Sequence, residues 1–283
     1  MVEERLVTTI KEIRRRLKSA GRKAIGFVPT MGALHEGHFS LIRQARQEND
    51  VVVVSIFVNP LQFGPDEDFA AYPRQPAADV RAAVAAGADT IFAPPAAEIY
   101  PEPPLTRVSV EGLDQALCGR YRPGHFTGVA TVVVKLLNIV GADRAYFGAK
   151  DWQQLVIVKR LAKDLDIDVE IVAVPTVREV DGLALSSRNR YLTAGQREAA
   201  LVLPEAIETA AALITGGERG PAKVIDAATK LIAGRPGVRL EYFSICRPDD
   251  LTDIVDEIAG EVLIAAAVYV GDTRLIDNKV MTI

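Results

Sequence analysis

The chain has 283 residues, enough for two domains of ordinary size or one large domain. Hydrophobic residues make up 49% of it and charged residues 25%, which excludes a disordered, collagen-like or coiled-coil chain. The 33 basic and 37 acidic side chains give a net charge of −4, without the broad positive field that nonspecific nucleic-acid binding needs. The two cysteines, Cys118 and Cys246, form no CxxC pair, so we expect no disulfide framework or zinc ribbon and a cytoplasmic location.

The N-terminal segment, residues 1–19, is densely charged and has no apolar stretch of signal-peptide length. We expect a solvated helix there. The longest apolar run, VVVVSIFV at 51–58, is far too short for a membrane helix and is rich in β-branched residues. The sequence therefore predicts a buried strand at this position and no membrane segment.

From residue 24 onward, strand-like and helix-like runs alternate. The predicted strands are 24–28, 51–58, 90–93, 144–147 and 169–174, and the predicted helices are 37–48, 77–86, 129–139 and 151–164. Continuous apolar strands between amphipathic helices are typical of a parallel sheet that is covered on both faces. The sequence therefore predicts a doubly wound, Rossmann-like α/β fold.

The pattern changes after residue 176. A polar loop leads to a helical run at 193–214 that Pro204 interrupts, and the predicted elements that follow are a helix at 222–232 and strands at 238–246, 261–270 and 274–277. This order is closer to α+β than to βαβ. We expect two domains, a Rossmann-like nucleotide-binding domain at 1–176 and a smaller α+β domain at 177–283 that closes over the site.

Two imidazoles, His35 and His38, follow the first predicted strand and stand at the start of a helix. Each can donate a hydrogen bond to phosphate, Gly32 and Gly37 allow close backbone approach, and a helix N-terminus favours anions. The pattern predicts a phosphate site. The alternatives are a surface and a capping histidine, or a metal site, which would lack ligands because the other candidates are His125 and two distant cysteines.

Polar side chains also follow other predicted strands, at the edge where an open α/β sheet binds ligands. After 51–58 comes a turn-rich loop with Asn59 and Gln62, which is otherwise read as a plain solvated loop. After 144–147, Lys150 can neutralise phosphate charge, while Asp151 is either a helix cap or a holder of a hydrated cation. Later in the chain, residues 186–188 (Ser-Ser-Arg) provide the donors of a phosphate clamp.

Neither GxGxxG nor GxxxxGK[ST] occurs, so the phosphate site is of another kind. The His-x-Gly-His segment with a later Ser/Arg-rich clamp is similar to the nucleotidyltransferases that attack the α-phosphate of ATP. Five motifs stand in order between Pro29 and Leu192: PTMGALHEGH, FVNPLQFGP, RPGHFTGV, FGAKDWQQL and DGLALSSRNRYL. Through these motifs and its length, the chain resembles the pantoate:beta-alanine ligase (pantothenate synthetase) family over essentially its whole extent.

This resemblance implies a reaction and its participants. The family condenses (R)-pantoate with beta-alanine at the expense of ATP, through a pantoyl adenylate, and gives pantothenate, AMP and pyrophosphate. We therefore expect an enzyme that uses Mg²⁺ with ATP, binds small-molecule substrates and no nucleic acid or membrane, and forms a homodimer. Because the adenylate is easily hydrolysed, we expect a loop that closes over it, with the Ser-Ser-Arg loop as the candidate.

The resemblance also implies site residues. The family's ATP site corresponds to Met31, Gly32, Ala33, Leu34, His35, Glu36, Gly37, His38, Gly148, Ala149, Lys150, Asp151, Val177, Leu185, Ser186, Ser187 and Arg188. The catalytic members are His35, His38, Lys150, Ser186, Ser187 and Arg188, with His38 in the position usually assigned as proton donor. Gln62 and Gln154 fall where pantoate is held, and Gln62 also where beta-alanine is recognised; no residue is implied as a protein-held metal ligand.

Two positions depart from the family pattern. Ala149 stands where the family usually has Glu, so any role of that carboxylate is in doubt, and Leu185 stands where Met is frequent, which keeps an apolar contact. Two other classes of protein remain open, a relative of the aminoacyl-tRNA synthetases and a noncatalytic nucleotide-binding protein. ATP–pyrophosphate exchange with pantoate, with amino acids and with neither distinguishes the three. We expect structural roles for Cys118 and His125.

Overall fold

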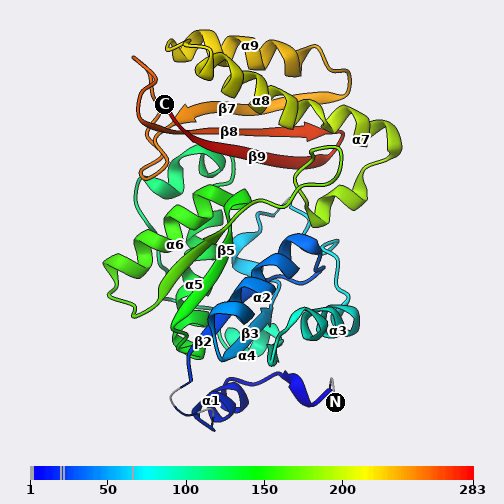
Figure 1. Ribbon diagram of the computed structural model, residues 1–283. Coiled ribbons are helices and arrows are strands. Elements are labelled where there is room, and N and C mark those ends of the chain that lie inside the picture. Colours follow the sequence, from blue (N-terminus) through cyan, green and yellow to red (C-terminus); the bar gives the residue numbers. More distant parts are fainter. Residues whose placement is uncertain (1–2, 20, 22, 66) are drawn as a thin grey trace.

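The computed structural model describes residues 3–19, 21, 23–65 and 67–283. Its larger sheet has six parallel strands in the order β1-β4-β3-β2-β5-β6 (Figure 1). Their bounds are β1 Leu6–Val7, β2 Ile25–Thr30, β3 Val51–Ile56, β4 Thr90–Phe92, β5 Arg144–Gly148 and β6 Glu170–Val174. The predicted doubly wound α/β class is confirmed.

Helices cover both faces of this sheet. They are α1 Ile10–Ser19, α2 Glu36–Glu48, α3 Pro76–Ala86, α4 Ala96–Ile99, α5 His125–Val140 and α6 Trp152–Asp164. Successive strand residues point to opposite faces. Phe27 accordingly packs into the core under α1, α5 and α6, whereas its neighbour Val28 packs into the core under α2 and α3.

The strand order places a topological switch point beside β2. From β2 the chain runs outward through β3 to β4, and it later returns to add β5 and then β6 on the other side of β2. Open parallel sheets bind ligands in the crevice outside the carboxyl ends of the two strands that flank such a point. The segments that follow β2 and β5 are those with the two histidines and with Lys150.

The C-terminal part forms an antiparallel sheet of β7 Val238–Cys246, β8 Glu261–Val270 and β9 Thr273–Thr282. Helices α7 Ala194–Ala200, α8 Val202–Thr215 and α9 Pro221–Ala233 accompany it, with α8 and α9 on its outer side (Figure 1). The other face packs inward, because Leu263 and Ala265 belong to the same apolar core as α5 and α6.

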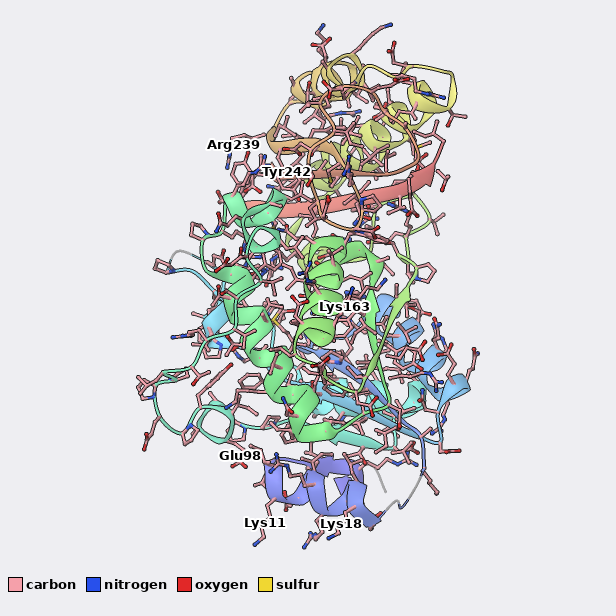
Figure 2. The ribbon with its side chains drawn as sticks, turned by 90° about the vertical axis from the view of Figure 1, so that its left-hand side faces the viewer. Lys11, Lys18, Glu98, Lys163, Arg239 and Tyr242 are labelled. Carbon is pink, nitrogen blue, oxygen red and sulfur yellow. The ribbon has the colours of Figure 1, made fainter. Side chains whose placement is uncertain are left out.

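Several predicted details need correction. The N-terminal segment is not one solvated helix: β1 pairs with β4, and α1 begins only at Ile10 and buries Ile13 and Leu17, while residues 1–2 lie outside the described residues. Figure 2 shows Lys11 and Lys18 of α1 on the side that faces away from the rest of the molecule. The helical run at 193–214 breaks at Leu201, before Pro204, because proline is tolerated in the first turn of a new helix.

Other elements were missed or too short in the sequence analysis. Strand β9 continues to Thr282, and helix α4 and the 3₁₀ turns at 60–62, 113–115 and 117–120 have no strong periodic signal. Among the residues that the structure describes, no helix is long and apolar enough to cross a membrane.

Candidate active site

A cavity of about 560 Å³ is lined by residues that follow β5, by the Ser-Ser-Arg segment and by β9. Predicted site residues in its lining are Lys150, Asp151, Gln154, Ser186 and Arg188. The predicted residues of the segment after β2 and Gln62 are not part of this lining, but the backbone oxygen of Gln62 contacts His125, which is.

Figure 2 shows Tyr242 of β7 at the junction of the small sheet with the segment around 117–121, where its ring stacks on that of Tyr121 at 5.8 Å.

His35 and His38 cap helix α2 reciprocally. The N–H of Gly37 donates to Nδ1 of His35 (3.2 Å), the N–H of His35 donates to Nδ1 of His38 (3.3 Å), and the two ring centroids lie 4.1 Å apart. Both residues therefore take part in the helix cap, whereas the alternative expected one capping and one surface histidine. The cap also uses the N–H of Gly37, one of the backbone groups at the N-terminus of α2.

This capping fixes the tautomer of both rings. Because each Nδ1 accepts a hydrogen bond, the proton of the neutral imidazole lies on Nε2. Burial lowers the pKa of His35 to about 4, with the positive charge of Lys150 acting in the same direction. Burial, followed by His35 and Lys150, lowers the pKa of His38 to about 3. Both rings are thus neutral at pH 7, with Nε2–H as a hydrogen-bond donor.

The loop before α2 is held by a carboxylate that the sequence analysis missed. Asp79 of α3 is buried and accepts hydrogen bonds from the N–H groups of Ala33 and Leu34, both at 2.9 Å. Its position inside an alanine-rich helix, 45 residues downstream of Leu34, gave no sequence signal that it reaches this loop.

Gln62 is buried, and its amide is oriented by two neighbours. Its Oε1 accepts from Nδ2 of Asn59 (3.1 Å), and its Nε2 donates to Sδ of Met31 (3.0 Å). Asn59, only 1% exposed, also donates to the backbone oxygen of Gly128 and accepts from the hydroxyl of Tyr100. The plain solvated-loop interpretation of this segment is therefore wrong, because both amides are buried in a hydrogen-bond network.

The Lys150 loop is attached to the small sheet. Asn278 of β9 donates through Nδ2 to the backbone oxygens of Ala149 (3.1 Å) and Lys150 (2.7 Å). Asp151 makes no side-chain cap bond at the start of α6, so the capping interpretation of this residue is wrong. Of the two glutamines that follow, Gln153 is buried and bonds the backbone of residues 113–118, whereas Gln154 lines the cavity.

The Ser-Ser-Arg segment contacts the segment 67–72. Ser186 caps the 3₁₀ turn at 187–191 by accepting from the N–H of Arg188 (3.2 Å), and the hydroxyl of the buried Ser187 lies 3.5 Å from that of Tyr72. The guanidinium of Arg188 pairs with the carboxylate of Asp68 through two hydrogen bonds. The clamp residues are thus fixed by a segment more than a hundred positions earlier in the chain.

A hairpin supports this clamp from the other side. The backbone oxygen of Val177 accepts from the N–H of Leu185 (3.0 Å), which brings these two predicted residues together. Asn189 donates to the Glu179 carboxylate and to the backbone oxygen of Ala184. Glu36, by contrast, pairs its exposed side chain with Arg43 along α2.

Two residues that we expected to be structural line the cavity. His125 donates from Nδ1 to the backbone oxygen of Gln62 (2.7 Å) and accepts from Arg122 at Nε2 (3.0 Å). Burial lowers its pKa to about 4, so the ring is neutral. Cys118 accepts a hydrogen bond at Sγ from Arg274. These contacts agree with structural roles, and both assignments stay predictions.

Within the described part of the chain, no three His, Cys, Asp or Glu side chains gather to hold a metal ion. A magnesium ion that arrives with a nucleotide takes most of its ligands from phosphates and water, together with one or two carboxylates. The donor set fits such an ion, because Asp151 lines the cavity next to Lys150 and has no capping bond.

The fold and the cavity define a doubly wound α/β protein with a cavity, lined by side chains of both charges, at the carboxyl edge of its parallel sheet. Residues 5–280 match the family model described as Pantoate-beta-alanine ligase. The chain belongs to the pantoate-beta-alanine ligase family.

The similarity to known proteins extends over essentially the whole length of the chain. The chain is 54% identical to pantothenate synthetase from Moorella thermoacetica over 280 residues, which cover 98% of this chain and 99% of the relative, and 52% identical to that from Heliobacterium modesticaldum, with 99% and 100% covered. The crystal structure of pantothenate synthetase from Thermus thermophilus superimposes with a TM-score of 0.92 at 46% identity and covers 97% of this chain and 98% of its own. The Francisella tularensis enzyme, solved as a complex with beta-gamma ATP and beta-alanine, gives 0.78 at 36% identity, with 97% and 96% covered.

Proposed function

We infer that this protein catalyses the ATP-dependent condensation of (R)-pantoate with beta-alanine to give pantothenate, AMP and pyrophosphate through a pantoyl adenylate. Membership of the family supports this reaction. The observation that carries it here is the lining of one cavity, which combines Lys150, Ser186 and Arg188 as phosphate donors with the uncharged amide of Gln154.

The polar but uncharged groups suit the acceptor substrate. Pantoate's carboxylate must act as nucleophile, and a tight pair with arginine would stabilise its ground state more than the transition state. Gln62 and Gln154 instead bind pantoate's hydroxyl groups and carboxylate while leaving it reactive, and Gln62 also receives beta-alanine. The orientation of the Gln62 amide by Asn59 and Met31 supports this assignment.

The phosphate donors stabilise the first transition state. As the carboxylate attacks the α-phosphorus, charge builds up on the phosphate oxygens, and preorganised donors lower the barrier. His35 and His38 act as neutral Nε2–H donors, because their low pKa values keep the rings neutral and each Nδ1 accepts a hydrogen bond from the backbone. Lys150, Ser186, Ser187 and Arg188 complete the set, so His38 serves by hydrogen bonding rather than as an imidazolium acid.

Backbone contacts complete the nucleotide site. We propose that ATP binds along three backbone segments, Met31 to His38, Gly148 to Asp151, and Val177 with Leu185 to Arg188. Mg²⁺ bound with the phosphates would be held by Asp151, and it would supply charge neutralisation and orientation of the triphosphate.

The larger organisation is also a proposal. Residues 1–176 would form the nucleotide- and pantoate-binding domain, and residues 177–283 the smaller domain that closes over the adenylate. The contacts of Asn278 with the Lys150 loop support this arrangement, because they tie β9 to the nucleotide site. We further propose that the enzyme is a cytoplasmic homodimer, which sedimentation would test.

Isotope transfer tests the reaction. With pantoate and Mg-ATP alone, the enzyme should catalyse ATP–pyrophosphate exchange, and ¹⁸O from the pantoate carboxylate should appear in AMP once beta-alanine is added. Exchange with an amino acid in place of pantoate would indicate an aminoacyl-tRNA synthetase relative. Label in inorganic phosphate instead of AMP would indicate an acyl phosphate and refute the adenylate route.

A further inference from the structure

The loop between β2 and α2 has an unusual backbone. Gly32 and Ala33 are consecutive residues with positive φ, +83° and +50°. An L-residue in this region costs about 1–2 kcal/mol, so Ala33 needs outside interactions to stay there. The loop leads directly into His35, whose backbone and side chain both take part in the cap of α2.

Asp79 provides such interactions from another element. Its two carboxylate oxygens accept separately, Oδ2 from the N–H of Ala33 and Oδ1 from that of Leu34. The carboxylate is 4% exposed and also packs against Gly32, where an added Cβ would lie 3.0 Å from Oδ2. Hydrogen bonds to a charged acceptor are about twice as strong as neutral ones, so Asp79 holds the backbone of this loop strongly.

We propose that Asp79 is a positioning residue for nucleotide binding, whose carboxylate holds the loop 31–34 in the conformation that aims His35 and His38 at the triphosphate. This inference rests on the proposed function. It adds a residue from α3, outside the segments that contact ATP in that proposal. The carboxylate itself is saturated by backbone N–H groups and touches no phosphate.

The direct test is Asp79→Asn, which preserves shape but replaces one acceptor oxygen by an NH₂ group that opposes a backbone N–H. The matched control is Asp143→Asn. Asp143 is exposed and accepts a hydrogen bond from the N–H of Ile25 (2.6 Å), so it also holds a backbone N–H, but at the opposite end of β2, away from the loop.

Binding is measured by calorimetry with Mg²⁺ and α,β-methylene ATP, which does not react. We expect Asp79→Asn to raise the Kd for this analogue and the KM for ATP by about 10- to 100-fold, the range for losing a hydrogen bond to a charged group. Asp143→Asn should leave the Kd unchanged.

The measurements distinguish a failure of the proposed function from a failure of the positioning role of Asp79. If wild-type protein does not bind the analogue, the proposed function fails. If wild type binds it and folded Asp79→Asn binds equally well, the positioning role is refuted. Should Asp79→Asn not fold, Gly32→Ala perturbs the same loop with Asp79 intact, and unchanged binding in that folded variant would likewise refute the role.

Discussion

The carboxylate of Asp68 occupies the guanidinium of Arg188, with hydrogen bonds of 2.8 Å to Nη2 and 3.2 Å to Nε. Both side chains line the cavity, at 29% and 27% exposure for Arg188 and Asp68 respectively. Burial opposes the charged form of Arg188, but the hydrogen bonds and charge of Asp68 raise its pKa overall. An internal carboxylate thus takes the place that we assign to a phosphate.

Asp68→Asn should therefore tighten nucleotide binding, because a phosphate would no longer compete with a carboxylate for Arg188. A partly exposed ion pair contributes about 0.5–1 kcal/mol, so the Kd for α,β-methylene ATP should fall about two- to fivefold. Calorimetry measures this change. Asp164→Asn, which breaks the exposed Arg160–Asp164 pair at the end of α6, is the control and should leave the Kd unchanged. Weaker binding in Asp68→Asn would show that Asp68 assists ATP directly.

The neutral state of the two capping histidines predicts an unusual pH profile. Removing one donor, in His38→Ala or separately in His35→Ala, should lower the adenylation rate by about 10²–10³. Since the pKa of each ring is about 3 to 4, kcat/KM for ATP in the wild type should show no histidine-dependent limb near pH 6.5. Stopped-flow measurement of pyrophosphate release from pH 5 to 8 checks both points. A limb at pH 6.5 that disappears in His38→Ala would contradict the neutral-donor assignment.

The histidines also predict how stability depends on pH. Burial lowers the pKa of all three, to about 4 for His35 and His125 and about 3 for His38, against an unfolded value of about 6.5. Below pH 6.5 the unfolded chain therefore binds more protons than the folded one. The free energy of unfolding should be highest above this pH and fall by about 1.4 kcal/mol per pH unit per histidine as the pH drops toward 4. Urea titrations at pH 7.5, 6 and 5 test this, and equal values at pH 7.5 and 5 would be inconsistent with it.

The adenylation rate should depend strongly on the side chain at position 150 and little on the one at position 149. Lys150→Ala should slow adenylation strongly, because a cavity-lining ammonium that neutralises phosphate is lost. Ala149→Glu restores the acid that is usual in the family. It should change the rate little, because a carboxylate cannot neutralise the negative charge of the phosphates. Single-turnover adenylation with each variant decides this. A large gain in Ala149→Glu would show that the loop does more than bind phosphate.

The sequence by itself predicted the parallel sheet, its covering helices and the segments that carry the site. Local signals suffice for these features, because burial on both faces requires continuous apolar strands, and ligands bind where such strands end. The histidine pair was predicted as a phosphate site in this way, whereas the Ser-Ser-Arg segment was predicted from its hydrogen-bond donors and the role of Gln62 from the family resemblance. The helix break at Leu201 was missed by three residues, because proline also fits the first turn of the following helix.

Only the tertiary structure decided how those segments are held. Asp79 anchors the loop before α2, Asp68 occupies Arg188, and Asn278 ties β9 to the Lys150 loop. Each partner lies between 45 and 128 residues away in the chain and is one ordinary polar side chain without a periodic pattern around it. Periodicity reports which face of an element is buried, whereas contacts between distant loops depend on how the elements pack, and that packing also set the tautomers of His35 and His38.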